Sequence, residues 1–543
     1  MSLYDKSSLL QVPSLYKDGT LVSTIPEDRS GDFTVVRGSN LSATRIGPDG
    51  YIKKGYDNLL YPSNNLASLC SNNFNGTASD SNQIANPVNG EVTADKLYTI
   101  VSGTSENRAR ISGYIQNGVQ TISMYAKYID YKYLYIRQLA SSNNQEAIFD
   151  IELGEITFDN LLIESKIEPA GNGWYRCSIT FNASSINNNL IDIGLSGSAT
   201  AFRGNVQDGV EMYFFGYMLN QGLIAYPYLE TTDAPAQGGL LENTPRLDWS
   251  NGVPSVLVEE GRTNLVPQTE YITIFSNVTP TYNTTDTLSP EGLYNALKAE
   301  AIGSNPRVRT QYTASDGVYT LSLFVKQGSS SYLKMVAYDR TNNHEATFNL
   351  TDGTFSGETT GVTAYSQDYG NGWYRCAITY TSAVSDTGLN YGQAYVNNGS
   401  TGNAYTYGYQ AEQASTPSSY IPTYGTTQTR SNEVISDDFS IPTTATIYNS
   451  FYSDVAETVF VFDQVFNVVE GLNKVAIAFS PTAVKISVGG SIVANATGTY
   501  DTTSLTNIQL GSNNGTDYSN APISGFYVFP EFLTDEELNS LTD

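Results

Sequence analysis

The chain has 543 residues, too many for a single hydrophobic core, so we expect three or four domains. Its formal net charge is −26 and no basic stripe occurs, which argues against a nucleic-acid ligand. Three cysteines give neither a disulfide framework nor a metal-ligand spacing, and no apolar run approaches the ~20 residues that cross a bilayer.

The N-terminal region, residues 1–60, is irregular and ends in TRIGPDGYIKKGYDNLLYPSN. We assign it to an attachment region that closes with a hairpin. It lacks a basic segment followed by an apolar stretch, so we expect no signal peptide and synthesis in a host cytoplasm.

An internal repeat organises the middle of the chain. Residues 171–181 read GNGWYRCSITF and residues 370–380 read GNGWYRCAITY, with nine of eleven positions identical at an offset of 199. The same offset aligns 122–156 with 321–355, and an offset of 192 aligns 216–232 with 408–424. Two copies are too few for a solenoid. We therefore predict two separate homologous domains, module 1 (61–236) and module 2 (269–429).

Each module alternates apolar and polar residues over short runs that begin after Gly-Asn-Gly turns, the period expected of strands. Residues 237–268 are predicted to form a hairpin that leads into module 2, as the earlier hairpin leads into module 1. Residues 430–543 have strand patterns at 458–462, 474–479, 484–488 and 523–529, then a short helix capped by Thr534 and Glu537. The predicted fold class is all-β, a multidomain set of antiparallel β-sandwiches with two jelly-roll modules.

Several of these motifs together resemble a known class. NGWYRC in a strand, a later G-x-x-x-x-Q segment and the Tyr420–Thr423 ending look like the carbohydrate-binding-module-like sandwiches of tailed-bacteriophage fibre and virion proteins. The segments GDFTVVRGSNLSATRIGPDGYI (31–52) and EEGRTNL (259–265) resemble the same proteins, and residues 430–543 are similar to a laminin-G or concanavalin-like lectin sandwich. The resemblance implies a structural protein on the virion surface, as a head fibre, tail fibre or related appendage.

A tyrosine strip is the main candidate for a ligand or partner face. In YKYLYIR (131–137), Leu134 and Ile136 share the parity of apolar residues in the second copy. Tyr131, Tyr133, Tyr135 and Arg137 are therefore predicted on the opposite, outward face, as a flat aromatic surface for sugar rings or a protein. Coverage of that face by a neighbouring strand, domain or subunit is the alternative.

The repeated residues Trp174, Cys177, Trp373 and Cys376 are interpreted as core residues of the two modules. The two cysteines would lie in different cores and would not bridge.

Catalytic signals are weak. His344 is the single histidine, and Gln145 takes its place in the other copy. Glu146 and Glu345 match across the copies, where a structural role is the more economical interpretation. We expect no enzyme activity and no cofactor; β-sandwiches often use calcium to fix loops, but no EF-hand-like spacing supports a structural calcium here.

The resulting hypothesis is a phage appendage protein that adheres to bacterial surface glycans, contacts other virion proteins through its N-terminal region, and associates as a homo-oligomer of undetermined order, with no membrane partner. A glycan-degrading depolymerase and a capsid decoration protein without glycan affinity are the alternatives.

Overall fold

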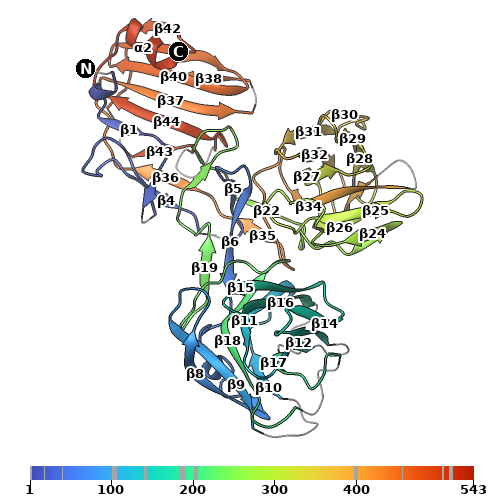
Figure 1. The fold of residues 1–543 in the computed structure, drawn as a ribbon. Helices are drawn as coiled ribbons and strands as arrows, with labels where there is room; N and C mark the ends of the chain where they lie inside the picture. The colour runs from blue at the N-terminus through green and yellow to red at the C-terminus, as the bar shows by residue number, and fades with distance from the viewer. Residues whose placement is uncertain are drawn as a thin grey trace.

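The computed structural model describes residues 3–17, 19–38, 41–100, 107–139, 144–183, 190–200, 206–396, 401–454, 456–503, 507–512 and 518–543. The fold is nearly all β, which confirms the predicted class. Three sandwiches meet at a central set of short strands (Figure 1). In the described residues no helix is long and apolar enough to cross a membrane.

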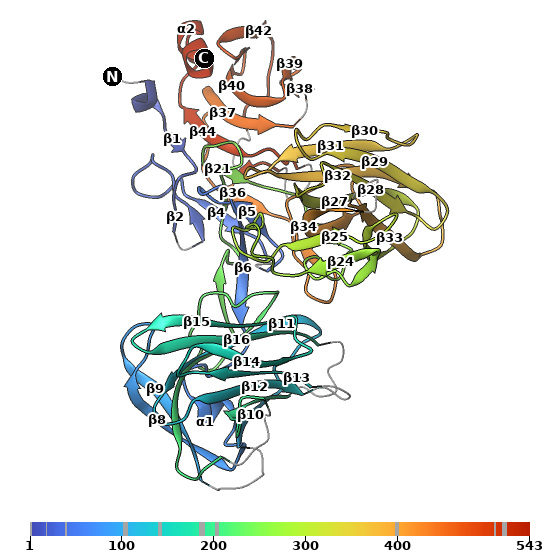
Figure 2. The same cartoon turned by 45° about the vertical axis from the view of Figure 1, so that its right-hand side comes forward.

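Module 1 is two six-stranded antiparallel sheets around one core. The first sheet, which we call proximal because it faces the centre of the molecule, has the order β15-β16-β11-β18-β9-β8, and the second, distal sheet has the order β14-β13-β12-β17-β10-β7 (Figure 2). The bounds are β7 (Phe74–Asn75), β8 (Thr77–Ala85), β9 (Val92–Thr99), β10 (Arg108–Ser112), β11 (Gly118–Tyr128), β12 (Tyr133–Leu139), β13 (Gln145–Asp150), β14 (Glu155–Asn160), β15 (Glu164–Gly171), β16 (Trp174–Ala183), β17 (Leu190–Leu195) and β18 (Glu211–Gln221), with a short helix α1 (Leu66–Leu69) before them.

Module 2 repeats this topology strand for strand. Its proximal sheet has the order β31-β32-β27-β34-β25-β24, and its distal sheet β30-β29-β28-β33-β26-β23. The bounds are β23 (Ile274–Ser276), β24 (Val278–Thr281), β25 (Leu297–Ala301), β26 (Arg307–Ala314), β27 (Gly317–Gln327), β28 (Tyr332–Tyr338), β29 (Asn343–Asn349), β30 (Phe355–Ser356), β31 (Thr363–Asp368), β32 (Trp373–Ser382), β33 (Gly388–Tyr395) and β34 (Gly402–Glu412). The repeated sequence therefore encodes one repeated arrangement of strands.

The third sandwich corrects the predicted boundaries at both hairpins. The region 1–60 is not a separate attachment segment, since β1 pairs with β44 and β4 pairs with β36. The predicted hairpin within 237–268 is formed by β20 and β21, but it joins this sandwich through Val256 and Ile523 before the chain enters module 2. The reason is burial: Leu9, Leu21, Phe33 and Val256 are apolar side chains that share one core with the C-terminal strands.

Two sheets form the third sandwich, an eight-stranded one (β20-β21-β44-β37-β40-β41-β42, with β1 on β44) and a five-stranded one (β2-β3-β4-β36-β43). Figure 1 places both chain ends here. The bounds are η1 (Leu3–Lys6), β1 (Leu9–Gln11), β2 (Tyr16–Lys17), β3 (Thr20–Leu21), β4 (Phe33–Val36), β20 (Arg246–Asp248), β21 (Ser255–Leu257), β36 (Val434–Asp437), β37 (Ala445–Ser453), β40 (Gly471–Ser480), β41 (Ala483–Val488), β42 (Ser491–Thr497), β43 (Ile508–Leu510) and β44 (Ile523–Phe529), with the separate hairpin β38 (Glu457–Val461) and β39 (Gln464–Val468).

The final helix, α2 (Asp535–Thr542), has the predicted capping box. Thr534 accepts a hydrogen bond from the Glu537 amide, and the Glu537 side chain accepts one from the Thr534 amide. Leu538 and Leu541 pack on the outer side of the eight-stranded sheet.

The entry and exit strands of the modules form the centre of the molecule, which we call the hub: β5 (Thr44–Ile46), β6 (Ile52–Asn58), β19 (Ala236–Gly239), β22 (Arg262–Asn264) and β35 (Gln428–Arg430). On entering module 1 the chain forms β6, which pairs with the exit strand β19; β22 and β35 do the same for module 2. Each module is thus closed at its base by a two-stranded ribbon.

Buried ions fasten both modules to the hub. Lys54 of β6 lies 2.7 Å from Glu270 and 3.1 Å from Glu291, with all three side chains almost fully buried. Burial alone would lower the pKa of Lys54, but these two carboxylates outweigh it and raise the pKa above the ordinary value. Tyr226 of module 1 donates a hydrogen bond of 2.7 Å to Glu291, so one network contacts both modules. Removing one member of the network would leave an uncompensated buried charge, which is strongly destabilising. The network therefore holds the two modules in a fixed orientation relative to the hub.

Candidate functional site

The predicted tyrosine strip is not formed. Tyr135 is fully buried and Arg137 is only 5% exposed, so these two side chains do not present an open surface. Tyr131 and Tyr133 are half-buried, meet edge to face at 85°, and the Tyr131 hydroxyl donates to the Ser196 carbonyl oxygen at 2.6 Å. The predicted direction of the side chains is nevertheless confirmed, since Leu134 and Ile136 point into the core of module 1.

The repeated tryptophans and cysteines lie on opposite faces of their strands. Cys177 and Cys376 are in the main cores, between the two sheets of each module. Trp174 and Trp373 are buried in small clusters on the outer side of the proximal sheets, and Trp373 packs with Ile52 of the hub. The prediction of one shared core is therefore wrong for the tryptophans, because residues three apart on a strand point to opposite faces. Both indoles are nevertheless buried, as a structural role requires, and offer no platform for a sugar; Trp373 also packs at the joint with the hub.

The cysteine thiols are poorly suited to chemistry. All three are free and buried. Burial raises the pKa of Cys70 to about 12 and raises those of Cys177 and Cys376 further above the ordinary value.

The single histidine is held in a structural contact. His344 Nε2 lies 3.0 Å from Asp339 Oδ2, and its ring stacks on Tyr380 with centroids 4.4 Å apart. Within the described residues, the side-chain partners of His344 are these two groups, and neither is a nucleophile that histidine activates in acyl transfer.

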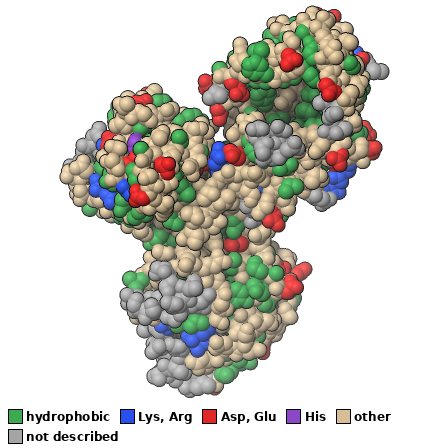
Figure 3. Space-filling model, turned by 180° about the vertical axis from the view of Figure 1, so that it is seen from behind, with side chains coloured by type: hydrophobic (Ala, Val, Ile, Leu, Met, Phe, Trp, Pro, Cys, Tyr) green, Lys and Arg blue, Asp and Glu red, His purple; other side chains and the backbone are tan. Residues whose placement is uncertain are grey.

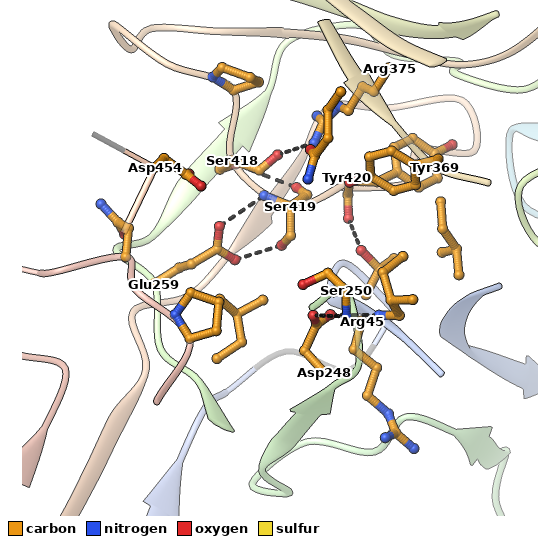
Figure 4. A pocket seen from close by; sticks show the side chains of 18 of the residues that line it. Arg45, Asp248, Ser250, Glu259, Tyr369, Arg375, Ser418, Ser419, Tyr420 and Asp454 are labelled. Carbon is orange, nitrogen blue, oxygen red and sulfur yellow. Dashed lines mark hydrogen bonds between the residues drawn. The ribbon is translucent and has the colours of Figure 1, made fainter. Parts of the chain in front are cut away.

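A polar pocket lies where module 2, the hub and the third sandwich meet (Figure 4). Its cavity is about 120 Å³. Figure 4 shows the Glu259 carboxylate turned toward Ser419, whose amide and hydroxyl donate to it at 2.9 and 2.6 Å. Arg375 donates to the Ser418 carbonyl oxygen at 2.6 Å on another side of the pocket.

The Glu259 carboxylate of this pocket is ion-paired with two arginines. Glu259 lies 2.8 Å from Arg246 and 3.1 Å from Arg430, and Arg246 also binds Glu433. Burial would raise the pKa of Glu259, but the Arg430 and Arg246 guanidinium groups outweigh it and hold the pKa well below its usual range. Asp454 differs, because burial and the nearby Glu259 and Glu470 carboxylates raise its pKa. With Glu259 held by two arginines, we interpret the pocket as a joint between units.

The distal face of module 2 has a different character. Tyr395 of β33 lies between two cations: the Arg307 guanidinium carbon is 5.5 Å from its ring centroid and the Lys334 Nζ is 4.8 Å from it. Arg309 lies 5.1 Å from the ring centroid of Tyr391 on the same strand. All five side chains are half-buried. Figure 3 shows Lys and Arg side chains gathered on module 2, on the left in that view.

The equivalent face of module 1 is closed by ion pairs. Arg110 makes a two-pronged contact with Asp192 at 2.6 and 2.8 Å, and Arg137 lies 3.4 Å from Glu146. Asp192 is fully buried, as is Tyr135 beside it. The same sheet position therefore presents cations in one module and neutralised pairs in the other.

Metal binding finds no support in the described residues, where no group of three or more His, Cys, Asp or Glu side chains is placed to hold an ion.

No protein-family profile matches the chain, and no curated protein matches it significantly. Among solved structures the chain is similar to the N-terminal CBM22-1–CBM22-2 tandem domain of Xyn10C from Paenibacillus barcinonensis. This distant likeness has a TM-score of 0.21 and 9% identity, and it covers 70% of this chain and 100% of that chain. At this score it carries no argument about the ligand, so function is argued from the site.

Sequence reasoning missed the face of module 2 for an identifiable reason. Tyr391 and Tyr395 lie in β33, between the segments that align at offsets of 199 and 192. The change in loop length hides the match between β17 and β33, so their differences could not be compared. Arg307 and Arg309 were visible as the counterparts of Arg108 and Arg110 at the offset of 199.

Proposed function

We propose that the protein is a non-catalytic adhesion protein that binds glycans through the distal face of module 2. The observation that carries the proposal is the accessible set of Tyr391, Tyr395, Arg307, Arg309 and Lys334 on a rigid sheet. Tyrosine rings and cationic side chains are groups that suit sugar rings and their polar substituents. The face belongs to strands, which hold side chains in place better than loops do.

The arrangement of the units supports this function. Both modules use their proximal sheets for the joint: Asn283 of module 2 donates to Glu164 of β15, and Trp373 donates to the Leu288 carbonyl oxygen beside the hub. The distal sheets are left to point away from the hub (Figure 2). A binding face held in place in this way favours contact with a large, fixed target, because little conformational entropy is lost on binding.

We further propose that the protein is an appendage of a tailed-phage particle, made in the host cytoplasm and displayed on the virion surface. This part of the proposal is supported by the sequence resemblance of residues 31–52, 171–181 and 259–265. It includes contacts with other virion proteins and self-association, which would convert weak single-site binding into avidity. Electron microscopy of particles labelled with an antibody against the chain tests it; label confined to unassembled protein would contradict it.

The adhesion proposal is tested by a glycan array with the full chain. The double variant Tyr391→Ala/Tyr395→Ala is expected to lose at least tenfold in affinity for any bound glycan, since it removes both the aromatic surface for the sugar ring and the rings that position the arginines. The matched control is Tyr294→Ala, which removes an exposed tyrosine of module 2 from another surface. Equal binding by all three proteins would contradict the proposed site.

The rival function, a depolymerase, is tested on the same glycans by release of reducing sugars. Asp454, whose pKa is raised at the pocket rim, is the residue that an acid-catalysed hydrolysis would use. Sugar release that Asp454→Asn abolishes would overturn the non-catalytic proposal.

A further inference from the structure

The two distal faces can be compared position by position through their strand registers. Arg108 pairs with Gly194 and Arg110 with Asp192 in module 1. In module 2, Arg307 pairs with Tyr395 and Arg309 with Gln393. The arginines are thus kept in both modules, while their neighbours change from glycine and aspartate to tyrosine and glutamine.

These replacements determine which groups the arginines contact in each module. In module 1, Asp192 receives both prongs of Arg110 and lies 3.9 Å from the Nε of Arg108. The Arg110 N–H groups that could bind a carboxylate of a ligand are therefore already bonded to Asp192.

In module 2 the arginines are held by rings instead of carboxylates. Arg307 and Arg309 lie over Tyr395 and Tyr391, and Arg307 donates one hydrogen bond of 3.0 Å to the Tyr395 hydroxyl. Within the part of the chain that the structure describes, Arg309 forms no hydrogen bond and no ion pair. The Nε atoms of Arg307 and Arg309 are buried, and the cation–π contacts orient the guanidinium groups so that their terminal Nη groups are left for an anion.

The charge of this face is opposite to that of the whole chain. Among the described residues, the carboxylate that pairs with one of the cations Arg307, Arg309 and Lys334 is that of Glu345, 3.2 Å from Lys334. The chain as a whole has a net charge of −26. An acidic polymer is therefore repelled at long range and attracted locally, so binding to it requires a fitted contact and weakens with salt.

We infer that the distal face of module 2 selects acidic glycans, binding the carboxylate of a uronic acid residue with Arg307 and Arg309, while module 1 contributes no such site. This inference rests on the proposed function and names the class of its ligand. Carboxylate and guanidinium match in a planar, two-pronged contact, and the tyrosines beside the arginines supply surface for the sugar ring.

The decisive variant is Gln393→Asp, which gives module 2 the carboxylate that module 1 has at the equivalent position. Because module 1 already accommodates this pair, the variant is expected to fold, with Asp at position 393 pairing with Arg309. Full-length protein is titrated calorimetrically with oligogalacturonate and with its methyl ester, which keeps the sugar and removes the charge. Wild-type protein is expected to bind the acid form at least tenfold more tightly than the ester, and Gln393→Asp is expected to abolish that preference.

Two further variants control for unrelated effects. Arg309→Gln is expected to lose at least tenfold in affinity for the acid form, whereas Lys298→Gln, which removes a basic side chain from the proximal sheet, is expected to change little. Equal affinity for ester and acid, with Tyr391→Ala/Tyr395→Ala still weakening both, would overturn the inference and leave the adhesion proposal standing. Equal binding of inorganic polyphosphate and oligogalacturonate would also overturn it, since that would show attraction to charge alone.

Discussion

Arginine and aspartate side chains in this protein have functions set by their nearest neighbours. Arg110 and Arg309 occupy equivalent positions, yet one is neutralised by a buried carboxylate and the other rests on a tyrosine ring. Asp57 of β6 shows the same dependence. It is 5% exposed, and its carboxylate accepts a long hydrogen bond of 3.2 Å from the Gln221 amide. Burial raises the pKa of Asp57 to about 6.

A raised pKa makes Asp57 a source of pH-dependent instability. The folded carboxyl binds its proton more tightly than the unfolded one, whose pKa is near 3.8, so the free energy of unfolding falls as pH rises from about 4 to 6. Asp57→Asn is expected to stabilise the protein by about 1–3 kcal/mol at pH 7.5 and by little below pH 4. Urea unfolding at both pH values measures this difference. The exposed Asp233→Asn is the control, and a gain of equal size at both pH values would contradict the assignment.

At the scale of elements, one asparagine closes the base of each module. Asn264 donates to the Tyr409 and Ile421 carbonyl oxygens and accepts from the Val266 and Ala411 amides, at 2.8 to 3.2 Å. Asn58 makes the four equivalent contacts in module 1. A buried amide with all four of these bonds joins the entry strand to β34 in module 2, or β18 in module 1, and to the exit segment, so the ribbon stays closed.

Removing this side chain is expected to open the base of module 2. Asn264→Ala removes the partner of four buried backbone groups, and because each unsatisfied group costs about 1–3 kcal/mol, a loss of at least about 4 kcal/mol is expected. Hydrogen exchange of the Val266 and Ala411 amides is expected to accelerate in the variant. Asn251→Ala, in an exposed turn, serves as control, and unchanged protection at Ala411 would show that the contact is dispensable.

At the scale of the whole molecule, the third sandwich is assembled from segments hundreds of residues apart. Leu9, Leu10 and Gln11 of β1 pair with Val528, Tyr527 and Phe526 of β44. The hairpin of β20 and β21 occupies the same edge, so the chain's beginning, middle and end share one sheet. Modules 1 and 2 are therefore insertions between parts of this sandwich, which explains how both modules are anchored at each of their ends.

A short truncation tests this assembly. Deleting residues 1–13 removes β1 and the fully buried Leu9, and is expected to lower the stability of the third sandwich by about 2–4 kcal/mol. Differential scanning calorimetry should show this loss in one transition while the transitions of the modules stay in place. Deleting residues 1–6 removes surface pairs of Lys6 and is expected to have little effect. A calorimetric profile unchanged by the longer deletion would contradict the shared core.

By itself, the sequence determined the features that depend on neighbours along the chain. Alternation at Leu134 and Ile136 gave the strands, the offset of 199 gave two like modules, and Thr534 with Glu537 gave the final helix, because period, turn and cap are local properties. Only the tertiary structure decided which segments share the third core and which arginines remain available for a ligand. Those outcomes depend on contacts such as Leu9 with Val528 and Arg110 with Asp192, which join residues far apart in the chain and leave no periodic signal in it.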